Sequence, residues 1–116
     1  MANARRGEIA ACFDGAEYTL CLTLGALAEL EQAFGARDLT QLVERFASGR
    51  LSASDLVTII AAGLRGAGNE VTRAEVERMR SDDGVAGFAD AASRLLEAAF
   101  GSPTGKETPP PNPPTP

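Results

Sequence analysis

The chain contains no histidine and no tryptophan, and the lack of histidine removes the side chain that most often transfers protons at neutral pH. Carboxylates could take its place. Most of them, however, fall at helical spacings that put them on solvated faces, and none stands in an apolar stripe where burial would raise its pKa. These acids are Glu29, Glu31, Glu44, Glu75, Glu77 and Glu97. We therefore expect a protein that is not an enzyme and that has no catalytic residue.

Metal and cofactor ligands are equally scarce. Two cysteines, Cys12 and Cys21, are too few for a disulfide scaffold and, without histidine, cannot complete a structural zinc tetrad. The glycine-rich GAGN at residues 66–69 follows a helical pattern and lacks the Lys-Ser/Thr pair of a phosphate loop, so we interpret it as a helix–helix connection. The acidic pair Asp82-Asp83 lacks the spaced ligands of a calcium loop, and we expect it to cap the next helix. We expect no metal site and no cofactor.

Long apolar runs and clustered basic residues are also missing. The longest apolar run is far below the roughly 20 residues that cross a bilayer, and no charged-then-apolar signal peptide opens the chain. The formal charge is −5, and Arg5-Arg6 is the only adjacent basic pair, which argues against recognition of a nucleic-acid backbone. We expect no nucleic-acid partner, no membrane partner and a cytoplasmic location.

Proline is absent from most of the chain. All seven prolines lie between Pro103 and Pro116, in a segment with almost no apolar side chains. Such a composition favours extended polyproline II and cannot offset the entropy of ordering its own backbone. We expect a flexible N-terminus at residues 1–6, one α+β domain at residues 7–101, and a disordered proline-rich tail at residues 102–116.

The first part of the domain, residues 7–23, has the period-two pattern of two strands around Asp14-Gly15. Asp-Gly between alternating runs indicates a hairpin with a type I′ turn, because both central residues of that turn need positive φ. A two-residue loop also places every large apolar residue on one face of the hairpin. The pairs on that face are Phe13 with Ala16, Ala11 with Tyr18 and Ile9 with Leu20.

The same register separates the two cysteines. Cys12 would lie opposite Glu17 and Cys21 opposite Glu8, so the thiols are four residues apart along the ladder, roughly 13 Å at the usual strand rise. A disulfide needs Cα atoms within about 7 Å. We expect both thiols to be free, half-buried and structural.

Helical spacing then replaces strand spacing, and we expect helices at about 24–34, 39–48, 53–65, 73–81 and 85–100. Thr23, Asp38 and Ser52 are expected N-caps, and Thr72 with Glu75 forms a capping box. The predicted fold is α+β, mainly α, with an N-terminal two-stranded antiparallel hairpin followed by a compact bundle of four to five short helices. The last helix has a broad apolar stripe that runs from Val85 to Phe100 and is interleaved with alanines, so its face could be buried in the domain or shared with another subunit.

Binding through surfaces is the activity that this composition leaves open. The candidate surfaces are the uncovered face of the hairpin, its two edges and the last helix. A lone hairpin is marginal in water and must pack on the helices through its apolar face. We expect its edges to be free to pair with another copy or with an extended partner.

Three segments carry a resemblance to a known family. They are LTLGALAELEQAFG at residues 22–35, DLTQLVERFASGRLSASDL at residues 38–56, and SRLLEAAFG at residues 93–101. Together with the hairpin, they resemble the gene-transfer-agent and phage family of tail assembly chaperones, also described as tail tube proteins. The resemblance covers about Arg6 to Gly101, and it offers no catalytic residues.

The resemblance implies a small helical protein with an N-terminal hairpin, which acts in tail assembly of a prophage or gene transfer agent. The implied partners are the tape-measure protein, which such chaperones keep soluble and extended, other tail proteins, and further copies of the chain. Two alternatives stay open. The chain could be a structural tube or ring component that remains in a virion-like particle, or a small protein-interaction adaptor unrelated to phage.

Overall fold

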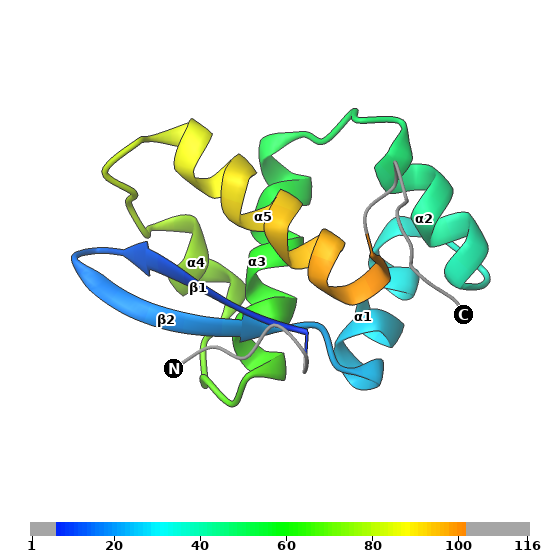
Figure 1. Cartoon of the computed structure of the whole chain (residues 1–116), viewed down its shortest axis with the longest axis horizontal. Coiled ribbons are helices and arrows are strands. Elements are labelled where there is room, and N and C mark those ends of the chain that lie inside the picture. The colour runs from blue at the N-terminus through cyan, green and yellow to red at the C-terminus, as the bar shows by residue number, and fades with distance from the viewer. Residues whose placement is uncertain (1–6, 102–116) are drawn as a thin grey trace, which may run out of the picture.

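The computed structural model describes residues 7–101, which form one hairpin and five helices (Figure 1). This confirms the predicted α+β, mainly α fold. The predicted flexible N-terminus and proline-rich tail lie outside the described residues. The elements are β1 (Glu8–Phe13), β2 (Ala16–Cys21), α1 (Leu24–Phe34), α2 (Leu39–Ala47), α3 (Ala53–Gly66), α4 (Arg73–Glu77) and α5 (Val85–Phe100).

The hairpin has the register that its turn predicts. Phe13 pairs with Ala16 across the turn, and Asp14 and Gly15 have φ of 56° and 75°, as a type I′ turn requires. No disulfide joins the two cysteines, in agreement with their predicted separation along the ladder. The expected half-burial holds for Cys21 and is wrong for Cys12, which is exposed because it lies on the outer face of the hairpin close to the turn.

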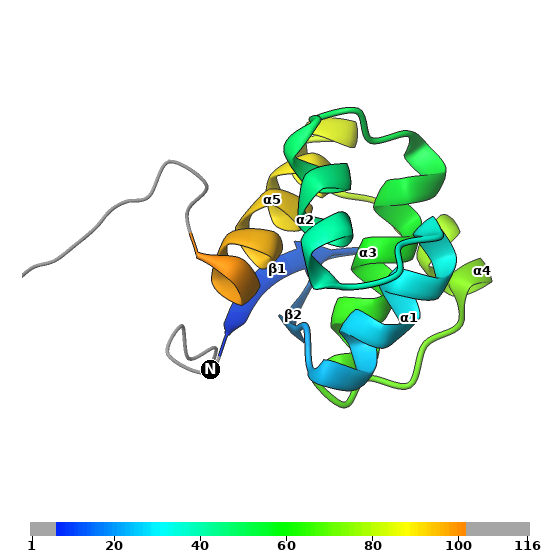
Figure 2. The same cartoon turned by 90° about the vertical axis from the view of Figure 1, so that its right-hand side faces the viewer.

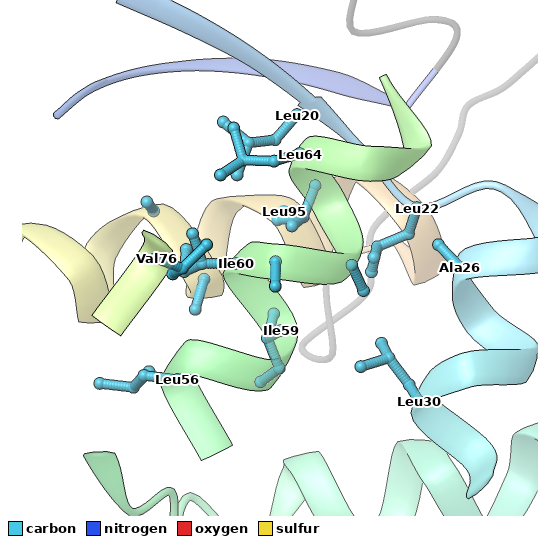
Figure 3. Close-up of a cluster of buried hydrophobic side chains, with 14 of the residues drawn as sticks. Leu20, Leu22, Ala26, Leu30, Leu56, Ile59, Ile60, Leu64, Val76 and Leu95 are labelled. Carbon is cyan, nitrogen blue, oxygen red and sulfur yellow. The ribbon is translucent and has the colours of Figure 1, made fainter. Parts of the chain in front are cut away.

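Helix α3 lies at the centre of the molecule and contacts β2, α1, α4 and α5 (Figure 1). Its side chains Ile59, Ile60 and Leu64 are fully buried. Figure 3 shows that Leu64 points toward Leu20 of β2, whereas Ile59 lies on the side of α3 that faces α1. The apolar face of the hairpin is therefore covered by the central helix, which is how a two-stranded sheet becomes stable.

Two glycines allow this close packing. A Cβ at Gly63 would overlap the end of the Leu95 side chain and press on Leu20, and a Cβ at Gly66 would overlap the carbonyl oxygen of Cys21. Glycine at these positions lets α3 approach both α5 and the backbone of β2. The end of β2 is thus fixed against the last turn of α3.

Helix α4 is shorter than predicted, because it ends at Glu77 and not near residue 81. The backbone of Arg80 is used elsewhere. Its N–H donates to Asp14 Oδ1 at 2.9 Å, and its carbonyl accepts the N–H of Asp14 at 2.8 Å. A contact with the hairpin turn therefore replaces the last helical hydrogen bonds, and local helical spacing gives no sign of it.

Two expectations for the start of α5 are also wrong. The acids Asp82 and Asp83 do not cap the helix, because the N-cap position falls one residue later, on Gly84, which has no side chain to accept a hydrogen bond. Val85 was expected in the apolar stripe, yet it is 73% exposed, because the stripe of α5 that meets the core is centred on Ala91, Ala92 and Leu95.

Candidate functional site

Metal-binding clusters and buried charges are both absent from residues 7–101. Within residues 7–101, no group of three or more acid, cysteine or histidine side chains is placed to hold a metal ion, and no polar or charged residue is buried. The same residues include no helix that is both long enough and apolar enough to cross a membrane. The candidate sites in this part of the chain are therefore surfaces.

The two outer edges of the hairpin are partly occupied by side chains of the domain itself. On β1, the carbonyl of Ala10 accepts a hydrogen bond from Arg94 Nη1 at 3.0 Å. On β2, the carbonyl of Thr19 accepts one from Asn69 Nδ2 at 2.9 Å. Both carbonyls belong to a pair that does not bond across the ladder, so they point outward. The expectation of free edges is thus wrong at these two positions.

Both side chains on the hairpin edges are held in place. Arg94 Nε donates to Asp90 Oδ2 at 2.9 Å, four residues earlier on α5. Asn69 Nδ2 also donates to the Leu64 carbonyl at the end of α3, 3.1 Å away. Asn69 ends the GAGN segment, which connects α3 to α4 as predicted. Asn69 therefore occupies part of the outer edge of β2.

The outer face of the hairpin is small and polar. It carries Cys12 opposite Glu17 near the turn, both exposed, and Ala10 opposite Thr19 further along. None of these four is a large apolar side chain. This face therefore cannot supply the apolar anchor that a protein interface normally needs.

Helix α5 resolves one alternative that its sequence leaves open. Its small residues Ala91 and Ala92 and its Leu95 are all fully buried, and the helix packs on α3 and β1 (Figure 1). The alanine-rich face is therefore used inside the domain. Leu96 and Phe100 lie to one side of that face and are only half-buried.

A groove opens on that side, between α2 and the C-terminal half of α5. Figure 2 shows these two helices next to each other. Its volume is about 190 Å³. Most of its lining is apolar. We call it the α2/α5 groove, and it is lined by Val43, Phe46, Ala47, Ser93, Leu96, Glu97, Phe100 and Gly101.

The sequence of α2 explains why the groove is apolar. At about 100° per residue, its five apolar side chains spread over an arc of about 140°. Only one edge of that arc meets the core, where Leu42 is fully buried, whereas Leu39 is 42% exposed and Val43 39% exposed. The apolar side chains on the arc are Leu39, Leu42, Val43, Phe46 and Ala47. The domain therefore covers only part of the apolar face of α2.

An aromatic and ionic cluster holds α2 in place. Phe46 meets Phe34 of α1 edge to face, with ring centroids 5.3 Å apart, and the Arg45 guanidinium lies 5.4 Å from the Phe34 centroid. Arg45 also donates to Asp55 Oδ2 at 2.9 Å and to the Arg50 carbonyl at 2.7 Å. These contacts fix the orientation of α2, which forms one wall of the α2/α5 groove.

Asp55 is the ionisable group that this cluster perturbs. Partial burial opposes its ionisation, but the hydrogen bond from the Ser52 N–H and the nearby Arg45 guanidinium outweigh that effect. Together they hold the pKa of Asp55 below its ordinary value. Asp55 also completes the capping box of α3 with Ser52. Its shifted pKa therefore belongs to a structural contact.

A second apolar hollow, of about 220 Å³, lies between α3, α4 and the N-terminal end of α5. Val85 lies at its edge, with Met79 and Phe88 among its lining residues. Of the charged residues, only Glu77 lines it. This hollow could therefore form apolar contacts, but it has little charge with which to distinguish one partner from another.

Sequence reasoning missed the α2/α5 groove and the two edge-closing side chains. For the groove a signal existed, because an apolar arc of that width on a nine-residue helix exceeds what one neighbouring helix covers. For Arg94 and Asn69 none existed, since their acceptors lie far away in sequence. Of the candidate surfaces named from the sequence, the last helix contributes residues to the groove, whereas the hairpin contributes none.

The model of the family described as "Phage tail tube protein, GTA-gp10" matches residues 6–102. Neither a curated protein nor a solved structure matches the chain significantly. The match spans the hairpin, all five helices of the described region and the α2/α5 groove.

Proposed function

The chain belongs to the family of phage tail tube proteins of the GTA-gp10 type, and on that premise we propose that it is an assembly chaperone that binds the tape-measure protein while the tail is built. Membership makes it a protein of a phage or gene-transfer-agent tail. It also makes interaction with other tail proteins part of its function. The description of the family names a tail protein and no enzymatic activity, and it gives no support to the idea of an adaptor unrelated to phage.

The observation that carries the chaperone proposal is the small hairpin, whose edges are partly occupied by side chains of the domain. A subunit of a tube contributes strands to a continuous barrel, in which each strand pairs with its neighbour on both sides. Here residues 7–101 hold two strands of six residues each, and the outward carbonyls of Ala10 and Thr19 are already bonded to Arg94 and Asn69. Joining a barrel through these edges would require breaking both contacts.

The surface chemistry suits a chaperone. A tape-measure protein exposes long apolar helical faces before the tube surrounds it, and a chaperone has to cover them transiently. The α2/α5 groove offers apolar side chains on a small domain, and the formal charge of −5 resists aggregation of the complex. Weak, reversible contact is sufficient, because the chaperone has to leave when tube subunits polymerise.

A second candidate function is a structural tube or ring subunit. The name of the family favours it, because that name describes a tail tube protein. In this case the chain would remain in the finished particle and would self-associate strongly. The two candidates therefore differ in stoichiometry in the particle.

Quantitative mass spectrometry of purified particles and of the producing cells tests the proposal. A chaperone is expected to be abundant in the lysate and absent from finished particles, and to co-purify with the tape-measure protein from a lysate that lacks tube subunits. Several stoichiometric copies per particle would replace the chaperone proposal with the tube or ring alternative. The major tube protein, measured in the same samples, is the control for recovery.

A further inference from the structure

We propose that the α2/α5 groove binds an amphipathic helix whose apolar face is flanked by basic side chains, and that the tape-measure protein supplies this helix. The identity of the helix rests on the proposed function, whereas its chemistry is inferred from the groove itself. Two features define that chemistry, an apolar floor and an electronegative rim.

The floor is formed by apolar side chains that the domain leaves partly uncovered. Val43 of α2 is 39% exposed, and Leu96 and Phe100 of α5 are half-buried. A volume of about 190 Å³ admits one or two apolar side chains, not the whole width of a helix. A partner helix would therefore lie over the groove, insert its central anchors and rest further apolar residues on the exposed Leu39, one turn before Val43.

The rim is electronegative for two reasons. Glu97 lines the groove, and its carboxylate has no cationic partner in the region from 7 to 101. In addition, the C-terminal residues of both helices, Ala47 and Phe100, line the groove, so the negative ends of two helix dipoles lie beside it.

Few cations offset this charge. The last turn of α5 has no basic residue. Arg45, in the last turn of α2, is engaged with Asp55, and Arg94 is engaged with Asp90 and the Ala10 carbonyl. Neither arginine lines the groove, and nor does Arg50 beyond the end of α2. The charge that would complement this rim is positive, so the partner carries Lys or Arg beside its apolar face.

The same charge argues against a second copy as the occupant. Two copies that met through this groove about a two-fold axis would bring together two electronegative rims, each with its own Glu97 carboxylate. Such like-charge contacts are costly when desolvated. With a formal charge of −5 on each chain, long-range attraction between copies is also absent.

The test uses two synthetic helical peptides of equal length. Both carry Leu at i, i+3, i+4 and i+7; one has Lys on its remaining faces and the other has Glu. Fluorescence anisotropy is measured with the full chain at low and at physiological salt. We expect binding of the Lys peptide at least tenfold tighter than that of the Glu peptide, with a difference that decreases as salt increases.

A matched pair of variants locates the binding surface. Val43→Glu and Val85→Glu make the same change at two exposed valines, one lining the groove and one at the opposite end of α5. Val43→Glu is expected to weaken binding of the Lys peptide at least tenfold, whereas Val85→Glu is expected to weaken it less than twofold. Equal loss in both variants, or loss only in Val85→Glu, would overturn the proposal, the latter in favour of the hollow beside α3 and α4.

A charge reversal keeps the test independent of folding defects at Val43. Glu97→Lys changes an exposed carboxylate, so the fold is retained. Glu97→Lys is expected to weaken binding of the Lys peptide and to strengthen binding of the Glu peptide. No change with either peptide would refute the role of the rim. A wild-type dimer that dissociates in Val43→Glu, measured by sedimentation, would instead identify a second copy as the occupant.

Co-purification with the tape-measure protein separates this inference from the proposed function. If wild type and Val43→Glu both retain the tape-measure protein, the chaperone proposal stands and the groove is not its site. If only wild type retains the tape-measure protein, the chaperone proposal and the groove as its binding site are both supported. If neither retains it while the Lys peptide still binds through Val43, the groove binds basic helices and the chaperone proposal fails.

Discussion

Asp14 and Arg80 hold each other through two reciprocal hydrogen bonds, although 66 positions separate them in the chain. The N–H of Asp14 donates to the Arg80 carbonyl at 2.8 Å, and the N–H of Arg80 donates to Asp14 Oδ1 at 2.9 Å. This pair fastens the tip of the hairpin to the segment between α4 and α5. It thereby orders a connection that has little regular structure of its own.

Replacing Asp14 by Ala should destabilise the protein by about 1–2 kcal/mol, because the Arg80 N–H loses its acceptor and a non-glycine residue at φ of 56° loses the Asp preference for that region. Asp14→Asn is the matched control, since Asn keeps an acceptor oxygen and favours the same turn. It should cost less than about 0.5 kcal/mol. Urea denaturation measures the free energy of unfolding of both variants. Equal losses would show that the side-chain oxygen of residue 14 does not contribute to stability.

The hairpin was predictable from the sequence because one local rule determines it. Asp-Gly requires a two-residue turn, that turn sets the register, and the register puts all large apolar side chains on one face. Every pair in the ladder agrees with it. Local capping rules likewise located the starts of α1 and α3 at Thr23 and Ser52.

The errors come from contacts between distant segments. Helix α4 ends early because the Arg80 backbone bonds to the hairpin turn, and the hairpin edges are closed by Arg94 and Asn69. Periodicity gives the phase of an apolar face, but not how much of it the rest of the chain covers. For that reason the helix at 39–48 was predicted and the width of its apolar arc was a signal, whereas the position of the groove beside Val43 could not be predicted.

The phase of α1 can be tested with the same substitution at two positions. Leu30 is fully buried and Leu24 is 81% exposed. Leu30→Ala should cost roughly 2–5 kcal/mol through lost burial and a residual cavity, whereas Leu24→Ala should change the free energy of unfolding by less than about 0.5 kcal/mol. Chemical denaturation of both variants provides the comparison. A cost below about 0.5 kcal/mol for Leu30→Ala would mean that the described packing of α1 is wrong.

The stability contributed by Asp55 should depend on pH in a defined direction. The pKa of Asp55 is lowered in the folded state from an ordinary value of 3.8, so the unfolded chain binds more protons between the two values. The contribution is therefore complete above the ordinary value and is lost as the pH falls through the folded value.

Asp55→Asn tests this direction. At pH 6 it should destabilise the protein by about 1–2 kcal/mol, because it removes the charged member of a capping box and of the contact with Arg45. The difference from wild type should shrink below the ordinary pKa of Asp55. Asp90→Asn is the control, because Asp90 belongs to an exposed pair on α5 that contributes less than about 1 kcal/mol. A cost for Asp55→Asn that is the same at pH 6 and at pH 3 would contradict the assignment.

The close approach of α3 to β2 gives the most specific prediction. A Cβ at Gly66 would overlap the carbonyl oxygen of Cys21, which is backbone and cannot rotate away, so Gly66→Ala should destabilise by about 1–3 kcal/mol or more. Gly25→Ala is the matched control in α1, where a Cβ would meet only Thr23 Oγ1 at 3.8 Å. That change should be neutral or stabilising by up to about 1 kcal/mol, since Ala is the better helix former. Thermal and urea denaturation of the two variants distinguish steric overlap from a general effect of glycine replacement. If Gly66→Ala proved as stable as Gly25→Ala, α3 could not lie against the end of β2 as described, and the position of Asn69 on the β2 edge would have to be revised with it.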